Sequence, residues 1–154
     1  MIGILKNEIV NGRDKDFFAI DSLNKINMTP TSACLFCDVV SNDFILPINT
    51  NVLKRTHIFN FNGVVITDDL MRSQDFVYTT YAKKRFLYLY HLDWPYIQDI
   101  RFAHLKKVLM NDNIGLIARS DSHASLIEQL FKKPDYIMPE WDHKTLIEID
   151  NNEQ

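Results

Sequence analysis

The sequence predicts an α/β domain built on a mainly parallel sheet with helices on both faces. Short apolar runs alternate along the chain with segments whose apolar residues recur at helical spacing. The runs are continuous rather than alternating, which is typical of strands that are covered on both faces. In such Rossmann-like domains, ligands lie outside the carboxyl ends of the strands.

Length and composition indicate one domain with a core of its own. The chain has 154 residues, of which 46% are hydrophobic and 24% charged. No apolar run approaches the roughly 20 residues that cross a bilayer, and the first residues lack the features of a signal peptide. We therefore expect a soluble protein of the cytoplasm, with residues 1–154 as a single unit and no membrane partner.

The charge balance argues against a dedicated nucleic-acid-binding protein. Seventeen basic and twenty acidic residues give a net charge of −3. Residues 83–133 carry nine basic and five acidic side chains, so a mildly positive face toward phosphates is one interpretation. Solvated helix surfaces are the interpretation that such charge patterns favour.

Glycine and cysteine usage excludes several kinds of site. The chain has four glycines, and no two lie close enough to form a phosphate-binding loop, so no nucleotide cofactor is expected. Cys34 and Cys37 form a Cys-x-x-Cys in an apolar run, without the two further ligands that a zinc site needs. We expect buried, reduced cysteines and no metal; redox or metal chemistry is the alternative.

The first half of the chain is expected to hold one helix and several strands. Residues 1–32 are polar and mixed, so we expect them to be peripheral. Asn62-Gly63 between apolar runs predicts a hairpin or a turn between two strands. The expected elements are a helix over 14–26, a buried strand over 33–40, an extended piece over 44–47 that Pro47 ends, and strands over 56–61 and 64–66.

The second half alternates helices with strands. Thr67 or Asp68 is expected to cap a helix. Asp68 and Asp69 are interpreted as a charge pair of its first turn, and a site formed by the two is the alternative. The expected elements are helices over 68–78, 97–111, 120–131 and 141–149, strands over 86–90, 114–118 and 135–138, and a flexible tail over 150–154.

The first candidate site follows the strongest predicted strand. His91 and Asp93 stand two residues apart there, followed by Trp94. An aspartate that orients an imidazole suits general-base chemistry near neutral pH, so these two residues are the catalytic candidates. The alternative is an ordinary loop histidine, an aspartate that caps the next helix, and a tryptophan packed on the sheet.

The second candidate site follows the strand over 114–118. Ser120 is placed to cap the next helix, and Arg119 stands beside the free backbone N–H groups of its first turn. Together they suit a phosphate or a carboxylate. The alternative is plain capping, with Arg119 paired to a neighbouring acid.

The ordered set of these segments resembles a known enzyme family. Tyr90-His91-Leu92-Asp93-Trp94, followed about 20 residues later by Ile114-Gly115-Leu116-Ile117-Ala118-Arg119-Ser120-Asp121-Ser122-His123, is similar to the N-terminal domain of GT-B-type glycosyltransferases. The similarity spans residues 58–148. The pattern also resembles short glycosyltransferase-like proteins of tailed phages, including those that glycosylate DNA bases.

The resemblance implies the acceptor-side half of an enzyme that moves sugar from a nucleotide-sugar to an acceptor hydroxyl. It places His91 and Asp93 at the cleft, and Trp94, Arg119, Ser120 and His123 as substrate-binding residues. In that family a second domain holds the donor, so the resemblance implies a partner chain or a second copy. It also implies the host cytoplasm as the location of a phage protein, and leaves nucleic acid only as an acceptor.

Two other functions remain as alternatives. The runner-up is a non-catalytic interaction or assembly module, marked by aromatic residues on its surface. The aromatic residues concerned are Tyr78, Tyr81, Trp94, Tyr96 and Trp141. A small hydrolase or nuclease is disfavoured, because the sequence has no nucleophile elbow and no metal-ligand motif.

Overall fold

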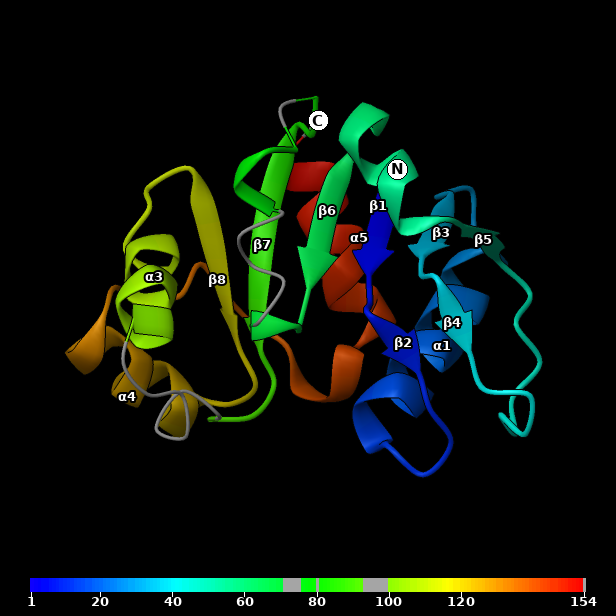
Figure 1. Ribbon diagram of the computed structural model, residues 1–154, viewed down its shortest axis with the longest axis horizontal. Coiled ribbons are helices and arrows are strands. Elements are labelled where there is room, and N and C mark those ends of the chain that lie inside the picture. Colours follow the sequence, from blue (N-terminus) through cyan, green and yellow to red (C-terminus); the bar gives the residue numbers. More distant parts are fainter. Residues whose placement is uncertain (71–75, 80, 93–99, 154) are drawn as a thin grey trace.

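A seven-stranded parallel sheet runs through the middle of the molecule (Figure 1). The structure, a computed structural model, describes residues 1–70, 76–79, 81–92 and 100–153. The strands of this sheet are β1 (Ile2–Leu5), β3 (Ala33–Phe36), β5 (Asn51–Leu53), β6 (Val64–Thr67), β7 (Lys84–Leu89), β8 (Ile114–Ala118) and β9 (Tyr136–Ile137). Their parallel pairing confirms the predicted Rossmann-like α/β class.

The order of the strands reverses once. In space they lie as β5-β3-β1-β6-β7-β8-β9. The chain therefore builds outward from β1 through β3 to β5, returns to place β6 on the other side of β1, and continues to β9. The reversal lies between β1 and β6, and a crevice at such a point is where open parallel sheets bind ligands.

Helices cover both faces of the sheet. The helices are α1 (Asp14–Ile26), α3 (Ile100–Leu109), α4 (Asp121–Leu130) and α5 (His143–Asn152), with 3₁₀ turns η1 (Arg55–Asn60) and η4 (Pro139–Trp141). A second, two-stranded sheet pairs β2 (Glu8–Ile9) with β4 (Val39–Val40). No helix within the described ranges is long and apolar enough to cross a membrane.

Strand β7 shows how the continuous apolar runs are used. Phe86 and Tyr88 pack into the cluster that contains residues of α1 and α5. Leu87 and Leu89 pack into the cluster on the opposite face, with residues of α3 and α4. Each such fully buried side chain contributes about 1.5–3 kcal/mol of hydrophobic stabilisation, so apolar residues are needed on both faces.

The prediction that residues 1–32 are peripheral is wrong, because β1 lies at the centre of the sheet between β3 and β6. Its four-residue run is short and contains Gly3, so it does not stand out from the polar residues around it. The glycine serves close packing: a Cβ at Gly3 would lie 2.7 Å from the ring of Phe36. The helix predicted over 14–26 is confirmed as α1.

The predicted hairpin at Asn62-Gly63 is also wrong. The segment before it forms the 3₁₀ turn η1 rather than a strand, and β6 pairs in parallel with β1 and β7. Gly63 is instead a point of close approach, since a Cβ there would lie 2.5 Å from the carbonyl oxygen of Met1. The Asn-Gly pair thus marks packing against the start of β1.

Smaller differences occur near both ends of the chain. The run over 33–40 divides into β3 and β4, the segment over 44–47 is not a strand, and β5 was not predicted. Trp141 belongs to η4, and α5 begins after Asp142, whose carboxylate accepts from Thr145 N at 2.9 Å. Helix α5 continues to Asn152 through the expected tail. Part of the helix expected over 68–78 lies outside the described residues.

Candidate functional site

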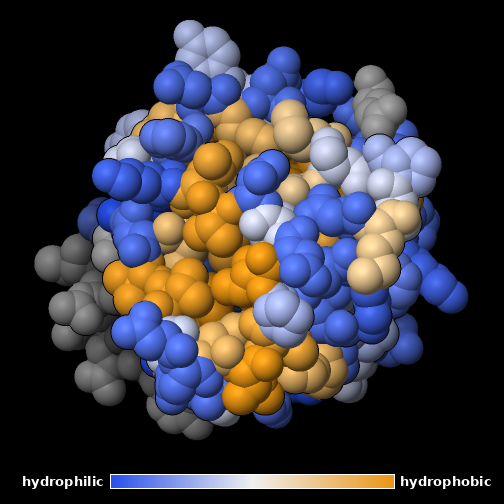
Figure 2. Space-filling view, turned by 90° about the vertical axis from the view of Figure 1, so that its right-hand side faces the viewer, coloured by the Kyte–Doolittle hydropathy of each residue, from blue (hydrophilic) through white to orange (hydrophobic). Residues whose placement is uncertain are grey.

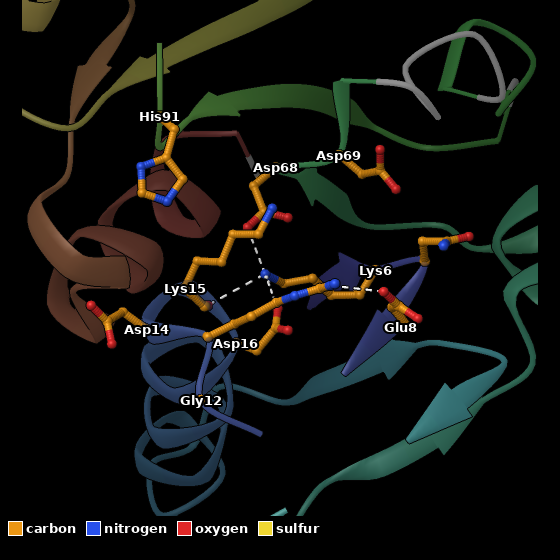
Figure 3. Close-up of a pocket in the computed structure, with 11 residues that line it drawn as sticks. Lys6, Glu8, Gly12, Asp14, Lys15, Asp16, Asp68, Asp69 and His91 are labelled. Carbon is orange, nitrogen blue, oxygen red and sulfur yellow. Dashed lines mark hydrogen bonds and ion pairs between the residues drawn. The ribbon is translucent and has the colours of Figure 1, made fainter. Parts of the chain in front are cut away.

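A cavity of about 590 Å³ opens at the reversal point of the sheet (Figure 3). Lys6 follows β1, Asp68 and Asp69 follow β6, and His91 lies just beyond β7, so three neighbouring strands deliver side chains to it. The segment from Asn7 to Asp16, which ends in the first turn of α1, supplies the remaining wall. The residues that line the cavity are Lys6, Asn7, Glu8, Gly12, Arg13, Asp14, Lys15, Asp16, Asp68, Asp69 and His91.

A buried ion triad forms part of the cavity wall. The Lys6 ammonium lies 3.0 Å from Asp16 Oδ1 and 2.5 Å from Asp68 Oδ2. Side-chain exposure is 2% for Lys6 and 1% for each aspartate. Since one cation meets two carboxylates, the triad carries a net negative charge away from bulk water, where charges interact more strongly.

The triad ties the β1 edge to helix α1. Lys6 Nζ also donates to the carbonyl oxygen of Lys15 at 3.3 Å, and Asp16 Oδ2 accepts from Val10 N at 3.1 Å. A 5.0 Å contact to the Trp141 ring adds a cation–π interaction. These contacts fix the connection before α1 without a glycine-rich turn.

The lining as a whole is acidic. Three of the residues are cationic and five are acidic, so its net charge is −2 with His91 neutral. Two of these charges neutralise each other in an exposed ion pair, in which Arg13 donates to Glu8 at 2.8 Å. Asp14 and Asp16 stand in the first turn of α1, where carboxylates complement the positive end of the helix dipole. The cavity therefore favours neutral or cationic groups over phosphates.

Of the two predicted catalytic residues, only His91 is described. It is exposed and lines the cavity, and its ring packs edge-on against Tyr90 with the centroids 4.7 Å apart. In Figure 3 the imidazole lies on the same side of the cavity as Asp68. Asp93 and the predicted substrate-binding residue Trp94 lie outside the described residues.

Arg119 is engaged by a carboxylate of its own protein. Its Nε donates to Glu140 Oε1 at 3.0 Å, its Nη2 donates to the same oxygen, and its guanidinium lies 4.4 Å from the centre of the Tyr90 ring. Burial pushes the pKa of Glu140 upward, but the hydrogen bonds from Tyr90 and Arg119 outweigh it, so this pKa is lowered. The structure thus shows the acid-paired alternative for Arg119.

Ser120 and His123 belong to the first turn of α4. Ser120 is the N-cap, and its hydroxyl accepts from His123 N at 3.3 Å. Burial and the charges of Arg119 and His91 lower the pKa of His123. Its Nδ1 is buried and has no hydrogen-bond partner among the described residues.

The two predicted sites therefore converge. His91 and Arg119 both contact the Tyr90 ring, and the charges of both act on His123. Sequence order alone separates them by nearly thirty residues, but β7 and β8 are paired neighbours whose carboxyl ends lie together. Of the described residues of the two predicted sites, His91 is the one that lines the cavity.

No protein-family model, curated protein or solved structure matches this chain.

Lys6 and Asp16 were not predicted as site features, and for Asp68 a site was the less favoured of two interpretations. The available signal was a lysine directly after the apolar Ile2–Leu5 run, at the position where a parallel strand delivers its first polar residue. Asp68, expected as a first-turn charge, is instead the partner of Lys6. In the part of the chain that the structure describes, no group of three His, Cys, Asp or Glu side chains is arranged to hold a metal ion.

Cys34 and Cys37 do not line the cavity. Both are buried and unpaired. Burial raises the pKa of Cys34 to about 11, and burial likewise raises the pKa of Cys37, whose Sγ contacts the carbonyl oxygen of Val39 at 3.0 Å. They are core residues in the thiol form, as their apolar sequence context favours.

Proposed function

We propose that this chain is the acceptor-binding half of a glycosyl-transfer system. In it, sugar moves from a nucleotide-sugar to an acceptor hydroxyl, and another domain or chain holds the donor. The observation that carries the proposal is the position of His91, the predicted base, on the wall of a cavity at the reversal point of the sheet.

The charge of the cavity supports an acceptor rather than a donor. A nucleotide-sugar carries a diphosphate, which a lining of net charge −2 repels. An acceptor sugar or alcohol is neutral and rich in hydroxyl donors, which carboxylates bind by charge-assisted hydrogen bonds. Arg119, the predicted phosphate ligand, is engaged by Glu140, which supports a proposal in which the donor is held elsewhere.

The proposed chemistry needs one base. His91 would take the proton of the acceptor hydroxyl while that oxygen attacks the anomeric carbon of the donor sugar. The bond between this carbon and the nucleoside diphosphate breaks, and the diphosphate leaves with the bonding electrons. Asp93 stays a prediction as the residue that orients His91.

Expression of the chain in the cells that naturally make it, where the chain that holds the donor is also present, tests this function. Mass spectrometry of small molecules, proteins and DNA should detect one product that is heavier by a hexose or N-acetylhexosamine residue. His91→Ala should abolish that product, whereas His57→Ala, which changes an exposed histidine on η1, should leave it. The proposal fails if no glycosylated product accumulates, or if His91→Ala makes as much as the native chain.

A second candidate function is that of an interaction module, favoured by apolar and aromatic surface. Tyr78 and Tyr81 are 70% and 67% exposed, whereas Trp141 is buried and so drops out of the predicted aromatic surface. Trp94 and Tyr96 lie outside the described residues. Figure 2 shows hydrophobic side chains gathered on the face that carries β4 and β5, where Val39, Ile45 and Val52 are exposed.

Paired substitutions distinguish the two functions. If the chain is a module, Tyr78→Ser with Tyr81→Ser should abolish recovery of a cross-linked partner, and His91→Ala should not affect it. If the chain binds an acceptor, His91→Ala should abolish product formation, and Tyr78→Ser with Tyr81→Ser should not affect it.

A further inference from the structure

The carboxylate of Asp68 is built into the cavity wall with one oxygen engaged and the other open. Asp68 lines the cavity, and its side chain is 1% exposed. Its Oδ2 accepts from Lys6 at 2.5 Å. Among the described residues no donor reaches Oδ1, so this buried carboxylate keeps an unfilled acceptor site.

Lys6 cannot serve a ligand in the same place. An ammonium has three hydrogens, and those of Lys6 are directed to Asp16 Oδ1, Asp68 Oδ2 and the carbonyl oxygen of Lys15. The single positive charge of Lys6 is also smaller than the combined negative charge of the two carboxylates that it contacts. A ligand phosphate at the triad would therefore meet net negative charge and no available donor from Lys6.

We propose that Asp68 Oδ1 accepts a hydroxyl of an uncharged polyol bound in this cavity, and that the cavity rejects phosphate esters of the same polyol. This inference rests on the proposed function, because it names the class of acceptor at the same site. An O–H···O⁻ bond to a fixed carboxylate is short and strong, and Lys6 holds this carboxylate in place.

The size and position of the cavity fit this class of ligand. A volume of about 590 Å³ lies within the range of small-molecule sites. His91 faces the same space from the neighbouring strand β7 (Figure 3). Asp68 and His91 therefore line the same cavity, which a ligand larger than a single hydroxyl group can share.

Saturation-transfer NMR with matched sugars tests the inference. The probes are methyl glucoside, methyl galactoside and methyl mannoside, each paired with its 6-phosphate. At least one neutral glycoside should bind, and its phosphate should bind at least about tenfold more weakly. Asp68→Asn should weaken the neutral glycoside by about tenfold or more, the change expected when a charge-assisted hydrogen bond is lost.

Asp68→Asn is a clean variant because it keeps the shape of the side chain. It leaves Lys6 paired one-to-one with Asp16, and the amide can turn its oxygen to Lys6 so that an NH₂ donor faces the cavity. A thermal unfolding curve establishes that the variant is folded. Glu128→Gln, which removes a charge from an exposed position of α4, is the matched control and should bind as the native chain does.

Three results would overturn the inference: no neutral glycoside binds, a phosphate binds as well as its glycoside, or folded Asp68→Asn binds as tightly as the native chain. The outcome is separable from that of the proposed function. Binding that depends on Asp68 without any transfer product supports this site and rejects glycosyl transfer. A product that requires His91 but survives Asp68→Asn supports transfer and rejects this site.

Discussion

The Lys6 ammonium lies 2.5 Å from Asp68 Oδ2, and this ion pair joins the ends of the two strands between which the sheet order reverses. Lys6 follows β1 and Asp68 follows β6, so the pair forms part of the wall of the cavity at the reversal point. The same ammonium holds Asp16 of α1. One side chain therefore links two strands and a helix at the candidate site.

Removal of the Lys6 charge should destabilise the fold strongly. Lys6→Met would leave two carboxylates buried side by side without a cation, and loss of one partner from a buried pair costs about 3–5 kcal/mol. Urea unfolding followed by circular dichroism measures this loss. Adding Asp16→Asn and Asp68→Asn to Lys6→Met should recover most of it, and a triple variant as unstable as Lys6→Met would contradict the electrostatic cause.

Loss of the Ser120 cap should cost a smaller amount. Ser120→Ala removes the hydroxyl that accepts from His123 N and should lower the free energy of unfolding by about 1 kcal/mol. Ser125→Ala is the matched control, since Ser125 Oγ donates to Asp121 O within the same helix and alanine is the better helix former. Equal losses in the two variants would argue against a capping role.

The cysteines should be unreactive until the protein unfolds. Burial raises the pKa of Cys34 to about 11 and also raises that of Cys37, and only a thiolate attacks a disulfide reagent. Ellman's reagent at mildly alkaline pH should therefore label the native chain far more slowly than the chain in concentrated guanidinium chloride. Rapid labelling of the native chain would contradict the core placement of both thiols.

Acid should weaken the contact between Arg119 and Glu140. The folded-state pKa of Glu140 lies below its ordinary value of 4.5, so the ionised form stabilises the folded state above that pH. This contribution disappears as the pH falls from 4.5 through the lowered pKa. Glu140→Gln should consequently show a shallower loss of stability in this range than the native chain.

Urea unfolding measured at several pH values follows this difference. Glu128→Gln provides the control, because its exposed side chain lies on α4 away from Arg119. A native-like acid slope for Glu140→Gln would place the acid sensitivity on other carboxylates. Asp142, whose pKa is also lowered although burial opposes it, is the first to examine in that case.

Local patterns predicted the elements that carry their own signals. The acidic start and apolar spacing of α1 defined its bounds, and the Ser120 cap marked the start of α4. Strand β8 was predicted with its exact bounds, because its apolar residues form one continuous run. Such elements are specified by residues close together in the sequence.

Elements that depend on distant residues were missed. Strand β1 is short and gains its place from pairing with β3 and β6. The Asn62-Gly63 pair has the chemistry of a turn, but Gly63 is required by its contact with Met1, which no local pattern encodes. The same reason hides the triad, because Lys6 and Asp68 are separated by 62 positions.

The central position of β1 has a consequence for synthesis of the chain. Its register pairs Ile2 with Ala33 on one side and with Val64 on the other. On the ribosome, this apolar strand therefore waits for more than sixty further residues before its second neighbour exists. Parallel pairing over such separations is slow and leaves apolar surface exposed to other chains. Folding of the nascent chain should therefore depend on how well β1 is shielded until β6 has been synthesised.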